Sequence, residues 1–403
     1  MDSVETYLSE VLAEIKPLRS RQLALAEALG AVLDGDVTAL SPLPSFDNSA
    51  MDGYAVRAAD VADVSADSPA TLKVLGEIPA GDTAAHAIEP GTCLHIMTGA
   101  PMPAGADTVI QVEHTDGGTE TVSIYQSAEP GTFVRVTGGD AQPGDVLIAS
   151  GTRLSAVHLG LLAATGRATV QARPRPRVTV ISTGDELVDP GTQLVPGQIW
   201  ESNATMLAAA ARQAGCPARR HPIVRDSTDA VLAAIEESLP GADLLITSGG
   251  VSMGGEHDVV KAALGSLGTV TFRKVALQPG MPQGFGVIGP DSTPIFTLPG
   301  NPVSAYVSFC LFVRPALDAL QSLPAGERGV SHTATLTEAV RSPAEKRSFL
   351  RGILDATSGQ VTPVTGQASH QLASLARANT LVIVPESVTS LDAGSTVEVI
   401  ELP

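Results

Sequence analysis

Acidic side chains follow the ends of several predicted strands in the middle of the chain. Asp185 and Glu186 come after the run VTVIST, Asp226 after HPIV, and Asp258 in the glycine-rich stretch that follows Ser248. Ligands of open parallel sheets bind in the crevice outside the carboxyl ends of the strands. We therefore expect these carboxylates to lie around one crevice.

Two loops at the same strand ends offer backbone N–H groups to an anion. Asn301 is a good N-cap and Pro302 a good first helical residue, so their helix would present a positive end. Glycines after Ser248 would let the backbone approach a phosphate closely. Carboxylates and phosphate in one crevice predict Mg²⁺ between them, and the acids available to hold it are Asp185, Glu186, Asp226 and Asp258. The candidate substrate-binding residues of the two loops are Ser248, Gly249, Gly250, Pro299, Gly300, Asn301 and Pro302.

Each of these features also has a purely structural interpretation. Asp185 and Glu186 could favour a helix N-terminus, Asp226 could cap the helix that begins near Ser227, and Asp258 could face water. The glycine loop could be a tight turn. Their occurrence at consecutive strand ends favours a site. The eight histidines show no metal-binding spacing, and no Ser-His-Asp arrangement can be assembled.

The stretch SFDNSAMDGYAV places two more carboxylates among small residues. Asp47 and Asp52 flank it just before the apolar Tyr-Ala-Val of a predicted strand. The structural alternative for Asp47 and Asn48 is an Asx turn before the strand.

The elements that must position these residues change in character along the chain. Residues 1–33 are expected to form two helices, the second within SRQLALAEALGAVL. Short alternating runs between turn residues then indicate an all-β insertion. Strands and helices alternate in the next part, which is typical of a doubly wound parallel sheet, and short strands return at the end. We predict four domains: I, 1–44 and 143–173, mixed α/β; II, 45–142, inserted β; III, 174–325, α/β; IV, 326–403, a C-terminal β-barrel-like domain.

Composition excludes several classes of partner. The net charge of −18 argues against nucleic acid and anionic membranes, which need a basic footprint. The longest apolar run, VSAYVSFCLFV, is shorter than the ~20 residues that span a bilayer. Three widely separated cysteines suggest neither a disulfide framework nor a zinc site, which fits a reducing cytoplasm.

Five motifs together resemble the MoeA family of molybdopterin molybdenumtransferases, which is related to the E domain of gephyrin. They are SFDNSAMDGYAV, IMTGAPMPAGADTVIQVE, STGDEL, TSGGVSMG and LPGNPVSAYVSF. The resemblance implies a molybdopterin-binding (MoCF-type) α/β domain and a reaction of molybdate with adenylylated molybdopterin, in which Mg²⁺ assists and AMP is released. It also implies elongated homodimers whose cleft is shared between domain III of one subunit and domain II of the other. The molybdopterin adenylyltransferase is a candidate partner.

Matching to the family motifs assigns further site residues. In domain II these are Asp52, Thr98 and Asp140. In the α/β domain the acids are Glu186, Asp226 and Asp258, framed by Pro299 and Pro302. The matching polar positions of the last domain are Arg351 and Ser369.

The sequence departs from the family pattern where two lysines are usual. Gln278 and Met281 occupy these positions in VALQPGMPQGFG. Gln278 can still donate hydrogen bonds to a substrate, but Met281 cannot. Arg351, Lys274 or Arg273 would have to supply the missing positive charge. The stretch GGVSMGGEHD is also one residue longer than the usual spacing between the glycine run and the acid.

Two other functions therefore remain open at this stage. One is a non-catalytic molybdopterin-binding or scaffold protein of the gephyrin kind, which the absent lysines favour. The other is a CinA-like nucleotide pyrophosphate hydrolase, against which the motifs around Asp52 and Thr98 argue, because they lie outside the α/β domain.

Overall fold

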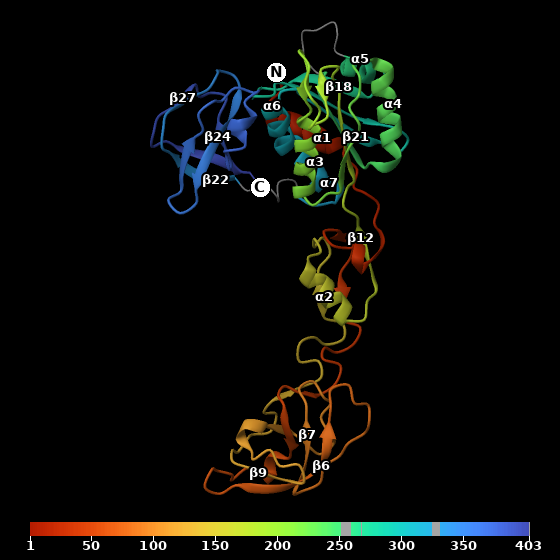
Figure 1. The fold of residues 1–403 in the computed structure, drawn as a ribbon, viewed down its shortest axis with the longest axis vertical. Coiled ribbons are helices and arrows are strands. Elements are labelled where there is room, and N and C mark those ends of the chain that lie inside the picture. Colours follow the sequence, from red (N-terminus) through yellow and green to blue (C-terminus); the bar gives the residue numbers. More distant parts are fainter. Residues whose placement is uncertain (251–258, 267, 325–330, 403) are drawn as a thin grey trace. The chain divides into compact units, whose positions relative to one another are not determined.

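The chain folds into two compact units in a computed structural model that describes residues 1–250, 259–266, 268–324 and 331–402. Unit 1 comprises Met1–Asp34, Arg153–Ser155 and Val170–Pro403, and unit 2 comprises Gly35–Thr152 and Ala156–Thr169 (Figure 1). Unit 2 is thus an excursion of the chain between two parts of unit 1. The finer division into four domains stays a prediction.

A six-stranded sheet forms the centre of unit 1. Its order is β16 (Ala218–Arg220), β13 (Val178–Ser182), β17 (Leu244–Ser248), β21 (Thr293–Leu298), β20 (Pro282–Ile288) and β18 (Val270–Lys274). The first four strands are parallel, as predicted, and β20 runs antiparallel to both of its neighbours. The strand β20 was not predicted because its glycines weaken the strand pattern. They are needed there, since a Cβ on Gly286 would lie 2.2 Å from the Thr269 carbonyl oxygen.

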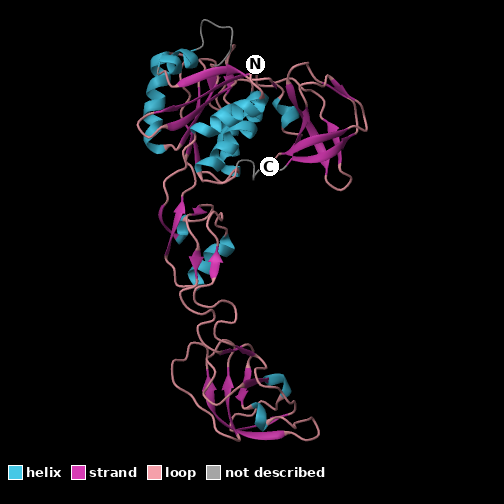
Figure 2. Cartoon of the chain, turned by 180° about the vertical axis from the view of Figure 1, so that it is seen from behind, coloured by secondary structure: helices cyan, strands magenta, loops and turns pink. Residues whose placement is uncertain are grey.

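Helices cover both faces of this sheet (Figures 1 and 2). One face carries α4 (Thr228–Ser238) and α5 (Val259–Ser266), and the other carries α1 (Val4–Glu14), α3 (Asn203–Gln213), α6 (Pro302–Ser308) and α7 (Arg314–Leu320). The strands serve both layers because successive side chains point to opposite faces. On β17, Leu244 and Ile246 join one apolar cluster and Leu245 joins the other. The doubly wound fold is therefore confirmed.

The segment from α6 to α7 is one continuous helix interrupted by a π-helical turn, Phe309–Val313. Pro302–Leu320 is long and apolar enough to cross a membrane by length and composition alone, but 78% of its window is buried inside the protein. Its apolar side chains belong to the larger core cluster of unit 1.

The predicted second helix within residues 1–33 is wrong. That segment forms strand β1 (Arg21–Ala24) and a single 3-10 turn, Leu25–Glu27. β1 pairs with β12 (Thr169–Arg173), which also pairs with β2 (Val32–Leu33). Only Leu23 of β1 is buried. Pairing with a strand far along the chain thus overrides the helix propensity of the Leu- and Ala-rich sequence.

The C-terminal part of unit 1 is a closed five-stranded barrel, as predicted. Its strands are β24 (Arg347–Asp355), β25 (Gln360–Pro363), β22 (Ser331–Leu336), β28 (Thr396–Glu401) and β26 (Thr380–Val384), and β24 also pairs with β26. Inside lies an apolar cluster that includes Val361, Val382 and Val399. Phe349 and Leu381 instead join the core of the α/β sheet. The barrel is therefore packed against that core.

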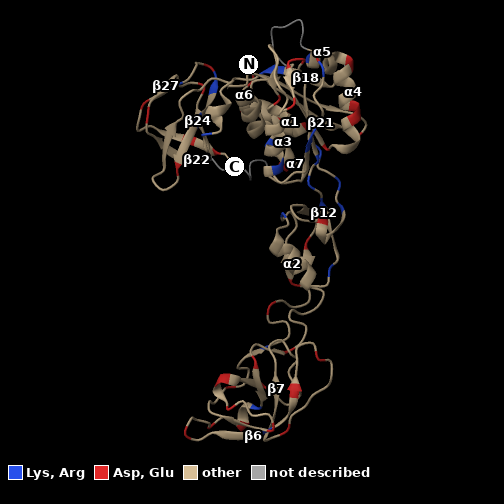
Figure 3. Ribbon diagram, in the orientation of Figure 1, with Lys and Arg blue, Asp and Glu red and all other residues tan. Residues whose placement is uncertain are grey.

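Unit 2 is built on a five-stranded sheet with an apolar cluster on each face. The order is β8 (Thr108–Gln111), β5 (Gly53–Val56), β7 (Thr92–Ile96), β6 (Ala70–Ile78) and β9 (Thr121–Ile124). Unit 2 also contains two separate strand pairs, β4 (Asn48–Ser49) with β10 (Val134–Arg135) and β3 (Val37–Thr38) with β11 (Val146–Ile148). The helix α2 (Ala156–Ala164) ends the excursion. Among the charged residues of this unit, acidic ones outnumber basic ones (Figure 3).

Candidate functional site

Asp185 and Asp226, which follow β13 and β16, are joined by two hydrogen bonds between backbone N–H groups and carboxylates. The backbone N–H of Asp185 donates to the Asp226 carboxylate at 3.3 Å, and the N–H of Asp226 donates to the Asp185 carboxylate at 3.4 Å. Asp226 is therefore not the cap of α4, a role that Ser227 fills by accepting from the Ala230 N–H. The structure leaves the Asp226 carboxylate exposed at the strand end, where a ligand can reach it.

Glu186 lies beside this pair and is exposed. Its carboxylate folds back over Gly184, where a Cβ would lie 2.6 Å from one carboxylate oxygen. Gly184 has φ of +159°, close to extended backbone, and the exposed Glu186 side chain lies against it. Asp258, the third predicted acid, lies outside the described residues.

A magnesium ion fits the described acids only with help from the substrate. Within the residues that the structure describes, no three His, Cys, Asp or Glu side chains form a metal-binding group. Mg²⁺ commonly takes one or two protein carboxylates and completes its shell with water and substrate phosphates. Glu186 and Asp226 are carboxylates of the type that Mg²⁺ takes, and both are exposed.

The glycine loop after β17 touches the neighbouring strand ends. Gly249 and Gly250 have φ values of +103° and +66°, which favour glycine. A Cβ on Gly249 would lie 3.0 Å from the Thr183 carbonyl oxygen. The N–H of Gly249 donates to the Leu298 carbonyl at 3.3 Å, so it is occupied within the sheet.

The loop after β21 meets the C-terminal barrel. Asn301 takes the predicted N-cap position and Pro302 the first turn of α6, but the Asn301 side chain makes no capping bond. Its amide donates to the Ser369 hydroxyl at 3.0 Å instead. The N–H of Val303 donates to the Ser369 carbonyl at 3.1 Å. The prediction that the Asn301 side chain caps α6 is thus wrong, because that side chain bonds instead to Ser369, a residue distant in the sequence.

Arg351 is a fully buried cation next to this junction. Its side chain is 0% exposed, and one guanidinium nitrogen donates to the carbonyls of Gly366 at 2.7 Å and Ala368 at 3.3 Å. Among the residues that the structure describes, the Nε and Nη1 atoms have no hydrogen-bond partner. Burial lowers the pKa of Arg351. Since a buried charge needs a counterion, two unused donors here suit an anion.

Gln278 and Met281 sit between the sheet and the barrel. Gln278 ends the short strand β19 (Leu277–Gln278), where it pairs with Ser348 of β24. The Met281 carbonyl accepts from the Val275 N–H at 2.9 Å. Through β24, Gln278 thus belongs to the same sheet as Arg351 and Arg347. Arg347 is already paired with Glu5 and Glu386, whereas no ion pair is found for Arg351 among the described residues.

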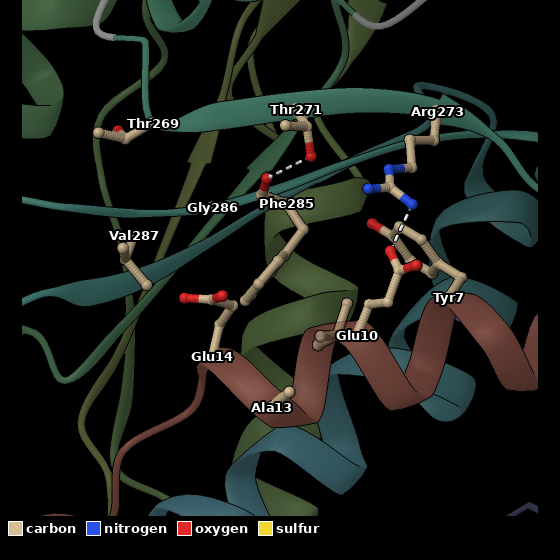
Figure 4. A pocket seen from close by; sticks show the side chains of 11 residues that line it. Tyr7, Glu10, Ala13, Glu14, Thr269, Thr271, Arg273, Phe285, Gly286 and Val287 are labelled. Carbon is tan, nitrogen blue, oxygen red and sulfur yellow. Dashed lines mark hydrogen bonds and ion pairs between the residues drawn. The ribbon is translucent and has the colours of Figure 1, made fainter.

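Arg273 does not replace the missing lysines. Figure 4 shows it beside Glu10 of α1, with which it forms an ion pair, and both residues line a cavity of about 410 Å³. It also lies 3.4 Å from the Asp2 carboxylate. Tyr7 lines the same cavity, and its buried hydroxyl has no hydrogen-bond partner in the described part of the chain. Of the predicted site residues that the structure describes, none lines this cavity.

In unit 2 the structure joins Asp52 to Thr98. One carboxylate oxygen of Asp52 accepts from the Thr98 N–H at 2.6 Å and from its hydroxyl at 2.8 Å. These two bonds, the backbone one first, lower the pKa of Asp52. Asp140 is exposed, and its N–H donates to the Leu43 carbonyl at 2.9 Å. Asp52 is therefore an exposed, ionised carboxylate that is held in one orientation.

Asp47 repeats this arrangement with Thr137. Its carboxylate accepts from the Thr137 N–H and hydroxyl, both at 2.6 Å. The Asx-turn alternative for Asp47 is therefore wrong, because its partner lies far along the chain. Asn48 bonds locally, donating to the Phe46 carbonyl at 3.1 Å.

Two residues at the strand ends were not among the predicted site residues. Glu201, 2% exposed, accepts from the Ser182 hydroxyl at 2.9 Å and from the Ala204 N–H at 2.5 Å. Asn203 donates to the Ser248 hydroxyl and the Gly300 carbonyl. The sequence signal available for them was an acid and an amide flanking the start of a predicted helix, directly after a short apolar pair.

Comparison with known proteins identifies the family. The MoeA N-terminal region (domains I and II) matches residues 2–166, a probable molybdopterin binding domain matches 179–319, and the MoeA C-terminal region (domain IV) matches 333–402. Molybdopterin molybdenumtransferase 2 of Mycobacterium tuberculosis is 46% identical over 408 residues, covering 100% of both chains. The chain belongs to the MoeA family. It is accordingly an enzyme of the transferase class.

Two further MoeA relatives agree with this assignment. Molybdopterin molybdenumtransferase of Bacillus subtilis is 36% identical over 94% of the chain and 89% of its own length. A molybdopterin biosynthesis MoeA protein from Pyrococcus horikoshii has a solved structure with a TM-score of 0.79, 33% identity and coverage of 99% and 98%. The MoeA matches on both sides of the α/β domain argue against the CinA-like alternative.

Proposed function

We propose that this transferase acts in molybdenum cofactor biosynthesis, transferring molybdenum from molybdate to adenylylated molybdopterin with Mg²⁺-dependent release of AMP. Full-length similarity to molybdopterin molybdenumtransferases supports the reaction class. The observation that carries the substrate assignment is the junction at Ser369, where a fully buried Arg351 with two unused donors adjoins the strand-end loops. Such a place suits an oxyanion beside a phosphate-bearing ligand.

The residues would divide the work by charge. Arg351 and Ser369 would hold an oxyanion through charge and hydrogen bonds, and Gln278 would add a neutral donor. Glu186 and Asp226 would hold Mg²⁺, which supplies neutralisation of the pyrophosphate and polarisation of the bond to AMP. Asp258, which lies outside the described residues, would join these acids as the sequence predicts.

Unit 2 would contribute Asp52, Thr98 and Asp140 from the second subunit of a homodimer. The lowered pKa keeps Asp52 ionised at neutral pH. Because Thr98 fixes its orientation, Asp52 would accept hydrogen bonds from water or from a hydrated cation at the shared cleft.

The test is AMP release from adenylylated molybdopterin by the purified protein with Mg²⁺, with and without molybdate. Release that requires molybdate is expected. Glu186→Gln should lower the rate by about 10²-fold or more with an unchanged melting temperature, because an exposed carboxylate contributes little to folding. Glu236→Gln, an exposed acid on α4, is the matched control and should keep the wild-type rate.

Two outcomes would change this assignment. Wild-type turnover in the Glu186→Gln variant would remove Glu186 from the reaction. Tight binding of the pterin by the wild type without any release of AMP would favour the non-catalytic alternative, for which Gln278 and Met281 in place of lysines are the specific observation.

A further inference from the structure

Asn203, the first residue of α3, bridges two loops of the candidate site. Its carboxamide nitrogen donates to the Ser248 hydroxyl at 2.9 Å and to the Gly300 carbonyl at 2.7 Å. A backbone carbonyl can only accept, so the contact with Gly300 fixes which end of the amide points there. One side chain thus ties the end of β17 to the loop after β21.

The two loops that it joins are in direct contact. A Cβ on Gly300 would lie 3.5 Å from the Cα of Gly249. These loops carry the glycine pair on one side and the Pro299–Pro302 helix start on the other. Their relative position therefore determines where any phosphate held between them would lie.

Asn203 is itself held firmly. The adjacent Glu201 is buried and accepts from the N–H groups of Ala204 at 2.5 Å and Thr205 at 3.3 Å, and from the Thr205 hydroxyl at 3.1 Å. These bonds anchor the first turn of α3. The backbone that carries Asn203 is consequently held in place.

The oxygen of the same amide, Oδ1, is buried and accepts no hydrogen bond from the described residues. Folding alone does not favour a buried acceptor that is left unsatisfied. The contribution of this carboxamide therefore lies in its nitrogen, which adds a side-chain link between the loops that follow the paired strands β17 and β21.

We propose that Asn203 is a positioning residue for the transfer reaction, holding the Ser248 loop against Gly300 in the arrangement that binds the pterin substrate. The inference rests on the proposed function for the identity of that substrate. Its expected signature is a loss of substrate affinity rather than of the chemical step, because in the proposed site both loops would contact the substrate as it binds.

The test compares Asn203→Ala with Asn379→Ala. Asn379 is a matched carboxamide in the barrel, which accepts from the Leu354 N–H at 2.7 Å and donates to the Leu354 carbonyl at 2.9 Å. Both variants should melt at lower temperature. Only Asn203→Ala should raise KM for adenylylated molybdopterin and Kd for molybdopterin about tenfold or more, with kcat changed less than about threefold.

Asn203→Asp distinguishes the loss of the Asn203 hydrogen bonds from the loss of side-chain volume. It preserves the volume but turns an oxygen toward the Gly300 carbonyl, so its affinity should fall as far as that of Asn203→Ala. Wild-type affinity in either Asn203 variant would overturn the inference. A wild type that binds molybdopterin without releasing AMP would refute the proposed reaction, while the binding comparison would still decide the role of Asn203. A wild type that binds no molybdopterin would overturn both.

Discussion

At the scale of single residues, the pairing of Asp52 with Thr98 makes a pH-dependent prediction. Thr98→Val removes the hydroxyl donor but keeps the backbone N–H, so the pKa of Asp52 should rise and still remain below its ordinary value. A carboxyl whose pKa is lowered by folding stabilises the protein above the unfolded pKa, and this contribution is lost as the pH falls through the folded pKa. The difference in melting temperature between wild type and variant should accordingly shrink on acidification.

The measurement is an NMR titration of the aspartate carboxyl carbons. Thr137→Val is the matched control, because it removes the same kind of hydroxyl from Asp47 and should leave the pKa of Asp52 unchanged. An unshifted Asp52 in Thr98→Val would show that the hydroxyl bond does not persist in solution.

The buried guanidinium of Arg351 makes a prediction about anions. Molybdate should raise the melting temperature of the wild type, since a ligand present at a hundred times its Kd stabilises by about 2.7 kcal/mol. Arg351→Met should lose this response and melt within about 4 °C of the wild type, because the variant removes an uncompensated buried charge along with two hydrogen bonds.

Arg347→Met is the control for Arg351 on the same strand. Arg347 already pairs with Glu5 and Glu386, so its loss should leave the response to molybdate intact. An undiminished shift in Arg351→Met, measured by thermal melting over a molybdate series, would place the oxyanion elsewhere.

At the scale of elements, the sequence predicted what depends on local patterns. The strands β13, β17 and β21 are continuous apolar runs, and their alternating sides fill two cores, so their place in a parallel sheet could be inferred. The wrong helix at β1 and the missed strand β20 have other causes. β1 depends on pairing with β12, far along the chain, which periodicity does not report. β20 pairs with strands close in sequence, β18 and β21, but its glycines weaken the strand pattern.

The same division applies to the site. Glu186 and Asp226 could be proposed as site residues because they come shortly after predicted strands. Glu201 and Asn203 were missed because their importance lies in contacts with Ser182, Ser248 and Gly300, which are far away in the chain. The Asn301 side chain failed as a cap for a related reason, since Ser369 of the barrel offered it a partner.

At the scale of the whole molecule, the candidate residues fall into two groups that belong to different units. Glu186, Asp226 and Arg351 lie in unit 1, whereas Asp52 and Thr98 lie in unit 2. A homodimer in which unit 2 of one subunit completes the site of the other would use both groups. We expect sedimentation to show a dimer.

Mixing two inactive variants tests that shared site directly. Asp52→Asn and Glu186→Gln, allowed to exchange subunits, should regain about a quarter of wild-type AMP release, because half of the dimers would be mixed and each would contain one intact site. Glu186→Gln mixed with Asp226→Asn should stay inactive, since both changes lie in unit 1 and every site would keep one of them. Recovery in the first mixture alone would establish a site shared between subunits. No recovery from a proven mixed dimer would instead assign Asp52 and Glu186 to the same chain's site.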